Sequence, residues 1–400
     1  MQQKSAHLTT VQQRLGHQAE VIPFSRPMKT ARELSNLERV LNSDHAHGDG
    51  VFTRSATRRL RSLTGVGHAL LTTSCTHALE MASQLLGIGP GDEVILPSFT
   101  FPSAANAIAM TGARIVFVDI DPETGNVDPQ QVAEAVGPNT KALSVMHYGG
   151  VPVDLDAISA IGAFHGIPVI EDNAHGLAVR VGERMLGGIG SLSTQSFHDT
   201  KNVHCGEGGA LLINDASLVE KAEIIREKGT NRSQFLRGEV DKYSWVALGS
   251  SYLMSEFNAA VLDSQLDEFE SIQARRLAVW TRYSAELQEW AGESGVRVMN
   301  PAQGIHAAHL FFLVMPDWES QALLIAHLRR FGVMATFHYV PLDSSPAGRR
   351  FGRVLRPLTQ SEDFSRRLVR LPLWPGMTDD EVSRVIAGVT SYERSTASWA

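Results

Sequence analysis

The stretch Ser196-Phe197-His198-Asp199-Thr200-Lys201 is followed closely by the glycine-rich run Gly206-Glu207-Gly208-Gly209. It places a lysine just after a predicted strand, between a hydroxyl residue and a flexible loop. Most lysines in such positions are solvated surface charges, because Lys is rarely buried without a partner. A lysine that is held near an aldehyde cofactor, and is neutral for part of the time, can instead form a Schiff base. Lys201 is therefore a candidate covalent residue if other parts of the chain supply a cofactor site.

The composition sets the broad class of the protein. The 400 residues are 43% hydrophobic, which is enough for a large core. The formal net charge of -7 comes without long runs of one sign, so we expect no nucleic-acid partner. Cys75 and Cys205 are too few for a disulfide framework. We find neither a signal peptide nor about 20 consecutive apolar residues. A cytoplasmic protein without a membrane span is expected.

A repeating pattern of apolar run, turn and helix extends from residue 69 to residue 171. Strands are predicted at 69–73, 94–96, 115–118, 142–145 and 168–171, with helices at 76–86, 103–110, 129–136 and 155–164 between them. This spacing is typical of crossover connections in a parallel sheet. The sequence predicts an α/β fold whose doubly wound sheet binds ligands beyond the carboxyl ends of its strands.

The two ends of the chain follow other patterns. Residues 1–20 are polar and Gln-rich, and we expect them to form a mobile extension. Residues 21–260 are predicted to form the large domain, and residues 261–400 a connecting helix and a small C-terminal domain. Strands at 309–315 and 333–339 and helices at 320–331 and 379–389 are expected in that small α/β domain.

One long amphipathic helix is expected over residues 255–287. Its apolar positions include Val261, Leu262, Leu266 and Phe269. Its charged residues, Asp263, Glu268, Arg275 and Arg276, are predicted to form a solvated face.

Hydroxyl and backbone N–H groups gather where the first predicted strand meets a helix, at Thr73-Ser74-Cys75-Thr76. Such a junction can bind an anion, because the first helical turn has unpaired N–H groups and the positive end of the helix dipole. An ordinary N-cap at Ser74 or Thr76 is the alternative. Neither GxGxxG nor GxxxxGK[ST] occurs here, so no dinucleotide fold or P-loop is indicated.

Three other predicted strands also end in candidate site residues. Phe99 and Phe101 can stack on a flat ligand or fill the core. His147 and Tyr148 can line a pocket or finish the core. Asp172 closes the most apolar strand, where a carboxylate is costly unless it meets a cation or several donors. A helix cap is the alternative for Asp172.

Together these residues meet the requirements of pyridoxal 5'-phosphate (PLP). Lys201 can form the imine, and Asp172 can keep the pyridine nitrogen protonated. An aromatic side chain can cover the ring, while hydroxyls and a helix N-terminus hold the phosphate. No metal is expected at His198, His204 and Cys205, because no fourth ligand stands at a useful spacing.

Six strings then resemble a known family: PSFTF (97–101), VIEDNAH (169–175), SFHDTKN (196–202), GEGGALLIND (206–215), REKGTNRSQF (226–235) and FHYVPL (337–342). In order and spacing they are similar to the DegT/StrS-type nucleotide-sugar aminotransferases, which are fold-type I PLP enzymes. The segments KGTNRSQF (228–235) and GSSYLMS (249–255) resemble the dTDP-4-amino-4,6-dideoxygalactose transaminases of that family. The resemblance covers about residues 22–392.

The resemblance implies a fold-type I PLP-dependent transferase, with a mixed, mostly parallel sheet in the large PLP-binding domain and a smaller C-terminal α/β domain. Lys201 would form the Schiff base and move the proton between cofactor and substrate. Asp172 would pair with the pyridinium nitrogen, His175 would lie near the phenolic oxygen, and Phe101 would stack on the ring. Because the family's site lies between two subunits, a homodimer is implied.

The resemblance also implies contacts to the phosphate and the sugar. Cys75, Thr76 and Ser196 would contact the phosphate. Many relatives add an Asn from the partner subunit, and Ser251 would take that role here. His338 and Tyr339 would border the sugar site.

A basic segment also holds candidate substrate residues, namely Asn231 and Arg232, with Lys228 and Arg237 close by in the sequence. Arginine can grip the pyrophosphate of a sugar nucleotide in a bidentate manner. An exposed loop of charges is the alternative.

Amino transfer is the implied reaction, because relatives that dehydrate sugars replace the Schiff-base lysine with histidine and this chain keeps Lys201. We expect L-glutamate to donate the amino group and C4 of a dTDP-4-keto-6-deoxyhexose, dTDP-4-keto-6-deoxy-D-glucose, to receive it. An aminotransferase for a C3-keto sugar nucleotide or another keto sugar is one alternative. A non-catalytic regulator with the PLP fold is another, although the intact Lys201 and Asp172 argue against it.

Overall fold

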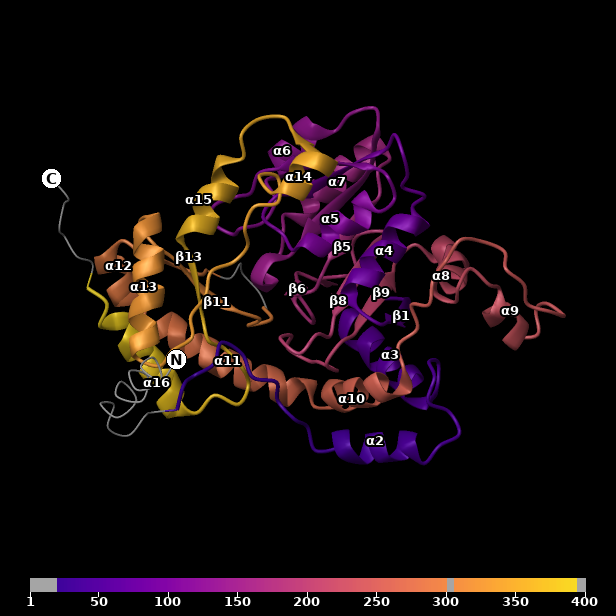
Figure 1. Cartoon of the computed structure of the whole chain (residues 1–400), viewed down its shortest axis with the longest axis horizontal. Coiled ribbons are helices and arrows are strands. Elements are labelled where there is room, and N and C mark those ends of the chain that lie inside the picture. Colours follow the sequence, from indigo (N-terminus) through magenta and orange to yellow (C-terminus); the bar gives the residue numbers. More distant parts are fainter. Residues whose placement is uncertain (1–19, 301–305, 394–400) are drawn as a thin grey trace, which may run out of the picture.

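The computed structural model describes residues 20–300 and 306–393. Nearly all of the predicted N-terminal extension lies outside these residues. Within them the chain forms a large lobe around an eight-stranded sheet and a small lobe around a three-stranded sheet (Figure 1). None of the helices in the described ranges has the length and apolar character that crossing a membrane requires.

The large sheet is mixed and mostly parallel. Its strand order is β1-β9-β8-β5-β4-β2-β3-β12. At one edge, β1 (His68–Thr72) and β8 (Leu192–Ser196) pair antiparallel with β9 (Gly209–Ile213). The other strands are parallel: β5 (Val169–Asp172), β4 (Thr140–Met146), β2 (Glu93–Pro97), β3 (Arg114–Val118) and β12 (Gly352–Val354). The predicted fold class is confirmed.

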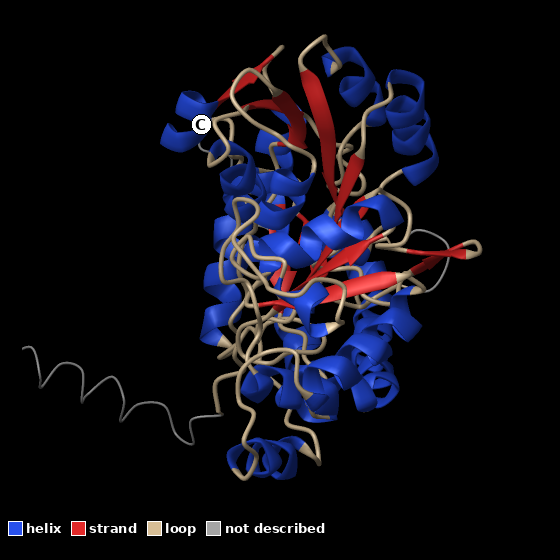
Figure 2. Cartoon of the chain, turned by 90° about the vertical axis from the view of Figure 1, so that its right-hand side faces the viewer, coloured by secondary structure: helices blue, strands red, loops and turns tan. Residues whose placement is uncertain are grey.

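Helices cover both faces of this sheet (Figure 2). On one face pack α4 (Cys75–Leu85), α5 (Pro102–Ala109) and α8 (Val219–Arg226), and on the other α6 (Pro129–Ala135) and α7 (Leu155–His165). Successive residues of a strand point to opposite faces. Val94 and Leu96 therefore join the first core and Ile95 the second. This double burial explains why strands such as β2 and β3 are apolar runs without polar alternation.

A third cluster lies beside the antiparallel edge. α2 (Glu33–Leu41) and α3 (Val51–Thr64) pack on α10 (Glu256–Asp267), and together they cover β1 and β9. The acid Glu256 accepts hydrogen bonds from the N–H groups of Phe52 and Thr53, at 2.8 and 2.9 Å. It thereby stabilises the N-terminus of α3.

The single helix expected over 255–287 is wrong, because the chain forms two helices. α10 ends at Asp267, and α11 (Phe269–Glu286) begins after a break at Glu268. The predicted solvated face is also wrong in part. Asp263 is buried against Arg59, and Arg276 is only 2% exposed. Their partners lie far away in the sequence, so helical periodicity alone cannot detect this burial.

The small lobe contains an antiparallel sheet of β10 (Arg297–Val298), β11 (Phe311–Val314) and β13 (Leu368–Leu371). Its helices are α12 (Gln288–Ser294), α13 (Trp318–Arg330), α15 (Thr359–Arg367) and α16 (Asp379–Thr390). The strand expected over 333–339 is wrong. That segment makes only isolated bridges, at Val333 with Ile22 and at Thr336 with Arg370.

The chain returns from the small lobe to the large sheet and leaves it again. After residue 340 it forms α14 (Pro346–Phe351) and then β12, which pairs with β3. This strand lies beyond residue 260, where the predicted large domain ends. The division of the chain into domains stays a prediction.

Candidate active site

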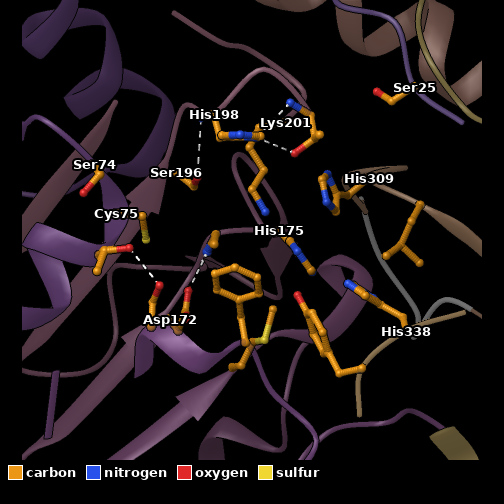
Figure 3. A pocket seen from close by; sticks show the side chains of 18 of the residues that line it. Ser25, Ser74, Cys75, Asp172, His175, Ser196, His198, Lys201, His309 and His338 are labelled. Atoms are coloured by element: carbon orange, nitrogen blue, oxygen red, sulfur yellow. Dashed lines mark hydrogen bonds between the residues drawn. The ribbon is translucent and has the colours of Figure 1, made fainter. Parts of the chain in front are cut away.

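A cavity of about 580 Å³ lies at the carboxyl ends of the strands, where the two lobes meet (Figure 3). Nine of the predicted site residues line it: Cys75, Thr76, Phe101, Asp172, His175, Ser196, Lys201, His338 and Tyr339. They come from loops after β1, β2, β5 and β8 and from the small lobe. The rule that ligands gather beyond the carboxyl ends of strands explains why these separate segments converge.

Lys201 lies in the loop after β8, and its side chain extends into the cavity (Figure 3). Its backbone N–H donates to the carbonyl of His198 at 2.9 Å. Burial lowers the pKa of the amine from its usual 10.5 to about 8, although Cys75 and Asp172 act in the opposite direction. Because only a neutral amine is nucleophilic, this environment favours covalent chemistry at Lys201.

Asp172 is the last residue of β5 and is 4% exposed. One of its carboxylate oxygens accepts a hydrogen bond from the N–H of Ala174 at 3.1 Å. Burial raises the pKa of this carboxyl group, while the Ala174 N–H and the charge of Lys201 oppose the rise. A cation in the cavity would therefore stabilise its ionised form.

The neighbouring acid, Glu171, points to the other face of β5 and has a different role. It accepts hydrogen bonds from His147 Nε2 at 3.1 Å and from the N–H of Gly187 at 3.0 Å. Although burial opposes ionisation, these donors hold the pKa of Glu171 below its usual value. His147 in turn accepts the N–H of Val153 at its Nδ1, 3.2 Å away. Of its two alternatives, His147 is therefore a core residue.

The N-terminus of α4 forms another wall of the cavity. Ser74 caps the helix by accepting the N–H of His77 at 3.1 Å. Cys75 and Thr76 are then the first two helical residues, whose N–H groups lack intrahelical acceptors. The predicted N-cap at Ser74 is confirmed. The anion site at this junction stays a prediction, and the free N–H groups of the first helical turn suit it.

The glycine run after Lys201 allows this wall to form. At Gly209, a Cβ would lie 2.3 Å from the backbone nitrogen of Cys75 and 2.3 Å from the carbonyl carbon of Ser74. Only a residue without a side chain lets the start of β9 pack so closely on the helix N-terminus.

Two stacked imidazoles form the side of the cavity opposite α4. The rings of His175 and His309 lie 4.1 Å apart, with an angle of 26° between their planes. His175 Nδ1 accepts the N–H of Gly149 at 3.2 Å, so its proton is on Nε2. Burial lowers the pKa of both rings well below the usual 6.5, and both are therefore neutral.

The remaining cavity residues belong mostly to an aromatic group. His338 Nδ1 lies 3.0 Å from the hydroxyl of the buried Tyr148. Phe101 is 52% exposed, and its ring centroid lies 6.0 Å from that of Tyr339. Phe99 is instead a core residue.

Three predicted residues do not line this cavity. Ser251 is exposed and forms a bridge with Glu227, and Arg232 Nη1 lies 3.7 Å from a carboxylate oxygen of the same glutamate. Asn231 accepts the N–H of Ser244 at 2.8 Å. Helix α9 (Arg232–Leu236) stands at the far side of the large lobe from the small lobe (Figure 1). The role of Ser251 across a subunit interface and the roles of Asn231 and Arg232 as substrate residues stay predictions.

Sequence reasoning missed three residues of the site: Asn202, His309 and Arg370. Asn202 directly follows Lys201 and bonds to His309, while His309 and Arg370 line the cavity from the small lobe. His309 and Arg370 lie just before β11 and within β13, and no local pattern indicates that these segments cover the large sheet.

The profile of the DegT/DnrJ/EryC1/StrS aminotransferase family matches residues 27–390. The chain belongs to this family. Spore coat polysaccharide biosynthesis protein SpsC of Bacillus subtilis (strain 168) is 33% identical over 376 residues, 92% of this chain and 96% of SpsC. The aminotransferase TlmJ from Streptoalloteichus hindustanus is 32% identical, with a TM-score of 0.85 over 92% of this chain and 98% of TlmJ. Spr1654 of Streptococcus pneumoniae, in its PLP form, is 25% identical, with a TM-score of 0.84 over 92% and 98% of the two chains.

This member of the family is therefore a PLP-dependent aminotransferase, and its cavity fits the cofactor. The carboxyl group of Asp172 has no cationic side chain within ion-pair distance among the described residues. The protonated ring nitrogen of the cofactor would be its cationic partner. The free N–H groups at the start of α4 suit a phosphate. Lys201 supplies an amine with a lowered pKa.

Proposed function

We propose that this enzyme transfers the amino group of L-glutamate to C4 of dTDP-4-keto-6-deoxy-D-glucose, giving a dTDP-4-amino-4,6-dideoxysugar. The observation that carries the amino transfer is the presence of Lys201 and Asp172 in one cavity. The sugar substrate is supported by the segments KGTNRSQF and GSSYLMS, and by likeness to a relative named for polysaccharide biosynthesis.

Each cavity residue has a role in this proposal. When bound, PLP supplies an aldehyde carbon for the amine and a ring that takes up electrons from the substrate carbon. Lys201 provides the nucleophilic amine and then carries the proton at its Nζ. Asp172 holds the proton on the ring nitrogen. The N–H groups of Cys75 and Thr76, with the hydroxyl of Ser196, bind the phosphate.

The histidine and aromatic side chains of the cavity orient the cofactor ring and the sugar. His175 presents Nε2–H to the phenolic oxygen of the cofactor, because its Nδ1 is occupied by the Gly149 N–H. Phe101 covers the ring, and its 52% exposure reflects a wall that a ligand would bury. His338 and Tyr339 border the sugar.

We further propose that two copies of the chain form the complete site. Ser251, Asn231 and Arg232 do not line the cavity of their own chain, and a second copy would place them at the phosphate and at the pyrophosphate. Both cysteines are free thiols, which fits a cytoplasmic location.

The proposal is tested by incubating the PLP-loaded protein and L-glutamate with 4-keto-6-deoxy and 3-keto-6-deoxy nucleotide sugars separately, followed by mass spectrometry. A product whose mass matches replacement of the keto oxygen by an amine is expected only from the 4-keto sugar. Lys201→Ala serves as the inactive control. Amination of the 3-keto sugar alone would reject the C4 assignment, and no amination of any sugar would reject the substrate class.

A further inference from the structure

Arg370 lies on β13 and forms the small-lobe wall of the cavity. Its backbone N–H donates to the carbonyl of Thr336 at 2.7 Å, and the Thr336 N–H donates back at 3.1 Å. On its other side Arg370 is paired with Phe312 of β11. Backbone hydrogen bonds to Thr336 on one side and strand pairing on the other therefore fix the position of the Arg370 backbone.

The guanidinium group of Arg370 has only neutral partners among the described residues. Its Nε and Nη2 atoms donate to the carbonyl of Phe337, at 3.3 and 3.0 Å. Its central carbon lies 4.5 Å from the ring centroid of Phe24. These contacts orient the five-donor fork but do not neutralise its charge, and Nη1 stays available.

The position of this charge within the cavity is unusual. The positive charge of Arg370 lowers the pKa of Lys201 and of the three cavity histidines, His175, His309 and His338. Arg370 therefore acts electrostatically on the nucleophilic amine and on the residues around it. Burial also lowers the pKa of Arg370 itself. A cation removed from water without a counter-charge is costly.

Arg276 shows what a purely structural buried arginine looks like in the same protein. Its Nε and Nη2 atoms donate to two different carbonyls, those of Ala308 and His309, and it does not line the cavity. It holds together the segment that carries His309. By contrast, two donors of Arg370 share the single carbonyl of Phe337, and Arg370 lines the cavity.

We propose that Arg370 binds a carboxylate of the amino donor and thereby holds the donor's amine beside Lys201. Arginine matches a carboxylate with two parallel N–H groups. In an α-amino acid the carboxylate is one carbon away from the amine, so a cation close to Lys201 can reach it. In a sugar nucleotide the pyrophosphate is attached to C1, across the ring from C4, which places it farther from the reacting carbon.

The inference rests on amino transfer, which the family establishes, and on the proposed donor, but not on the proposed keto sugar. The donor's half of the reaction can be measured without any sugar. Glutamate gives up its amino group to the cofactor and leaves as 2-oxoglutarate, and the change in cofactor absorbance reports the rate. The second half is measured by adding the sugar to enzyme that already carries the amino group.

The test compares Arg370→Gln and Arg370→Lys with Arg366→Gln as a matched control. Arg366 lies on α15, is more than half exposed and pairs with Glu362 at 2.8 Å, outside the cavity. Loss of one partner of a desolvated ion pair should lower kcat/KM for glutamate by roughly 30- to 1,000-fold. Arg370→Lys should retain part of the wild-type kcat/KM for glutamate, since lysine keeps the positive charge but lacks the two parallel N–H donors of arginine. The sugar half should change by less than about threefold in either variant.

A loss confined to the sugar half would assign the anion site to the pyrophosphate and overturn the carboxylate assignment. Equal losses in both halves, or none, would overturn an anion-binding role. Succinate, an unreactive dicarboxylate, gives a readout that needs no turnover. It should raise the Tm of the wild-type holoenzyme and of Arg366→Gln, but not that of Arg370→Gln. An equal rise in Arg370→Gln would also contradict the inference.

Discussion

The amide oxygen of Asn202 lies 2.8 Å from Nδ1 of His309, and this contact determines which imidazole nitrogen carries the proton. Asn202 Nδ2 donates to the carbonyl of Ala307 at 2.6 Å and to the side-chain oxygen of Gln273 at 3.0 Å. The oxygen of the Asn202 amide must therefore face His309. His309 then donates from Nδ1 and leaves Nε2 as an acceptor.

The orientation of Asn202 predicts a non-additive pair of mutations. Asn202→Leu should lower kcat/KM about tenfold, because His309 no longer has a fixed proton position. In His309→Gln the amide oxygen replaces Nε2 as acceptor without needing Asn202. In the His309→Gln background, Asn202→Leu should therefore change kcat/KM by less than about twofold. Equal losses in both backgrounds would mean that Asn202 acts only on the fold.

Lys201→Ala should abolish the absorbance of lysine-bound PLP and lower kcat by at least about a thousandfold, because both the nucleophile and the proton carrier are lost. Lys221→Ala is a suitable control, since Lys221 bonds to helix carbonyls on the large lobe away from the cavity. Absorbance scans and steady-state rates decide the question. Retention of the absorbance band in Lys201→Ala would contradict the assignment.

The pKa of Lys201 predicts the pH dependence of cofactor capture. With a pKa of about 8, roughly a tenth of this amine is neutral at pH 7. The rate at which the apoprotein reacts with PLP should rise with pH and level off above about pH 8, as stopped-flow absorbance would show. Asp172→Asn removes a charge that raises this pKa, so the inflection should move to lower pH. An inflection near pH 10 would show an unperturbed lysine.

Asp172→Asn should lower kcat about a hundredfold while leaving the fold intact, because the ring nitrogen loses its anionic partner. The matched control is Asp156→Asn, an exposed acid on α7 that pairs with Arg184. Circular dichroism and Tm would verify folding. Similar rates for the two variants would refute the role of Asp172.

Gly209→Ala should destabilise the protein by about 3 kcal/mol or more, because the new methyl group would collide with backbone atoms at the start of α4 that cannot move aside. Gly89→Ala is the control, since nothing lies within 4 Å of its Cβ position. Urea titration gives both values. PLP affinity should fall in Gly209→Ala as well, through displacement of the N–H groups of Cys75 and Thr76.

Sequence patterns predicted most of the large lobe because many of its buried strands are apolar runs bounded by turn residues. Val94, Ile95 and Leu96 illustrate this, since burial on both faces leaves no polar position. The break at Glu268 and the burial of Arg276 were not predicted. Both depend on segments that meet only after folding, such as the carbonyls of Ala308 and His309.

The candidate site divides in the same way. Asp172 was identified because a carboxylate at the end of an apolar strand is costly unless it meets a cation or several donors. Lys201 was identified because Asp172 and the other candidate residues together supply a cofactor site for it. His309 and Arg370 were missed because their position over the cavity depends on how the small lobe packs. Asn202 was missed because its role depends on a tautomer of a residue more than a hundred positions away.

Strand β12 has a consequence for how the enzyme can be divided. The polypeptide leaves the large sheet after α10, visits the small lobe, supplies the edge strand Gly352–Val354, and only then completes the small sheet with β13. The N-terminal segment adds another crossing, because Ile22 bridges Val333 of the small lobe before the chain enters the large lobe. Within the described residues the lobes are therefore joined by four covalent crossings. No single cut separates them, and a protein truncated after residue 300 would lose an edge of its main sheet together with the Arg370 wall of the cavity.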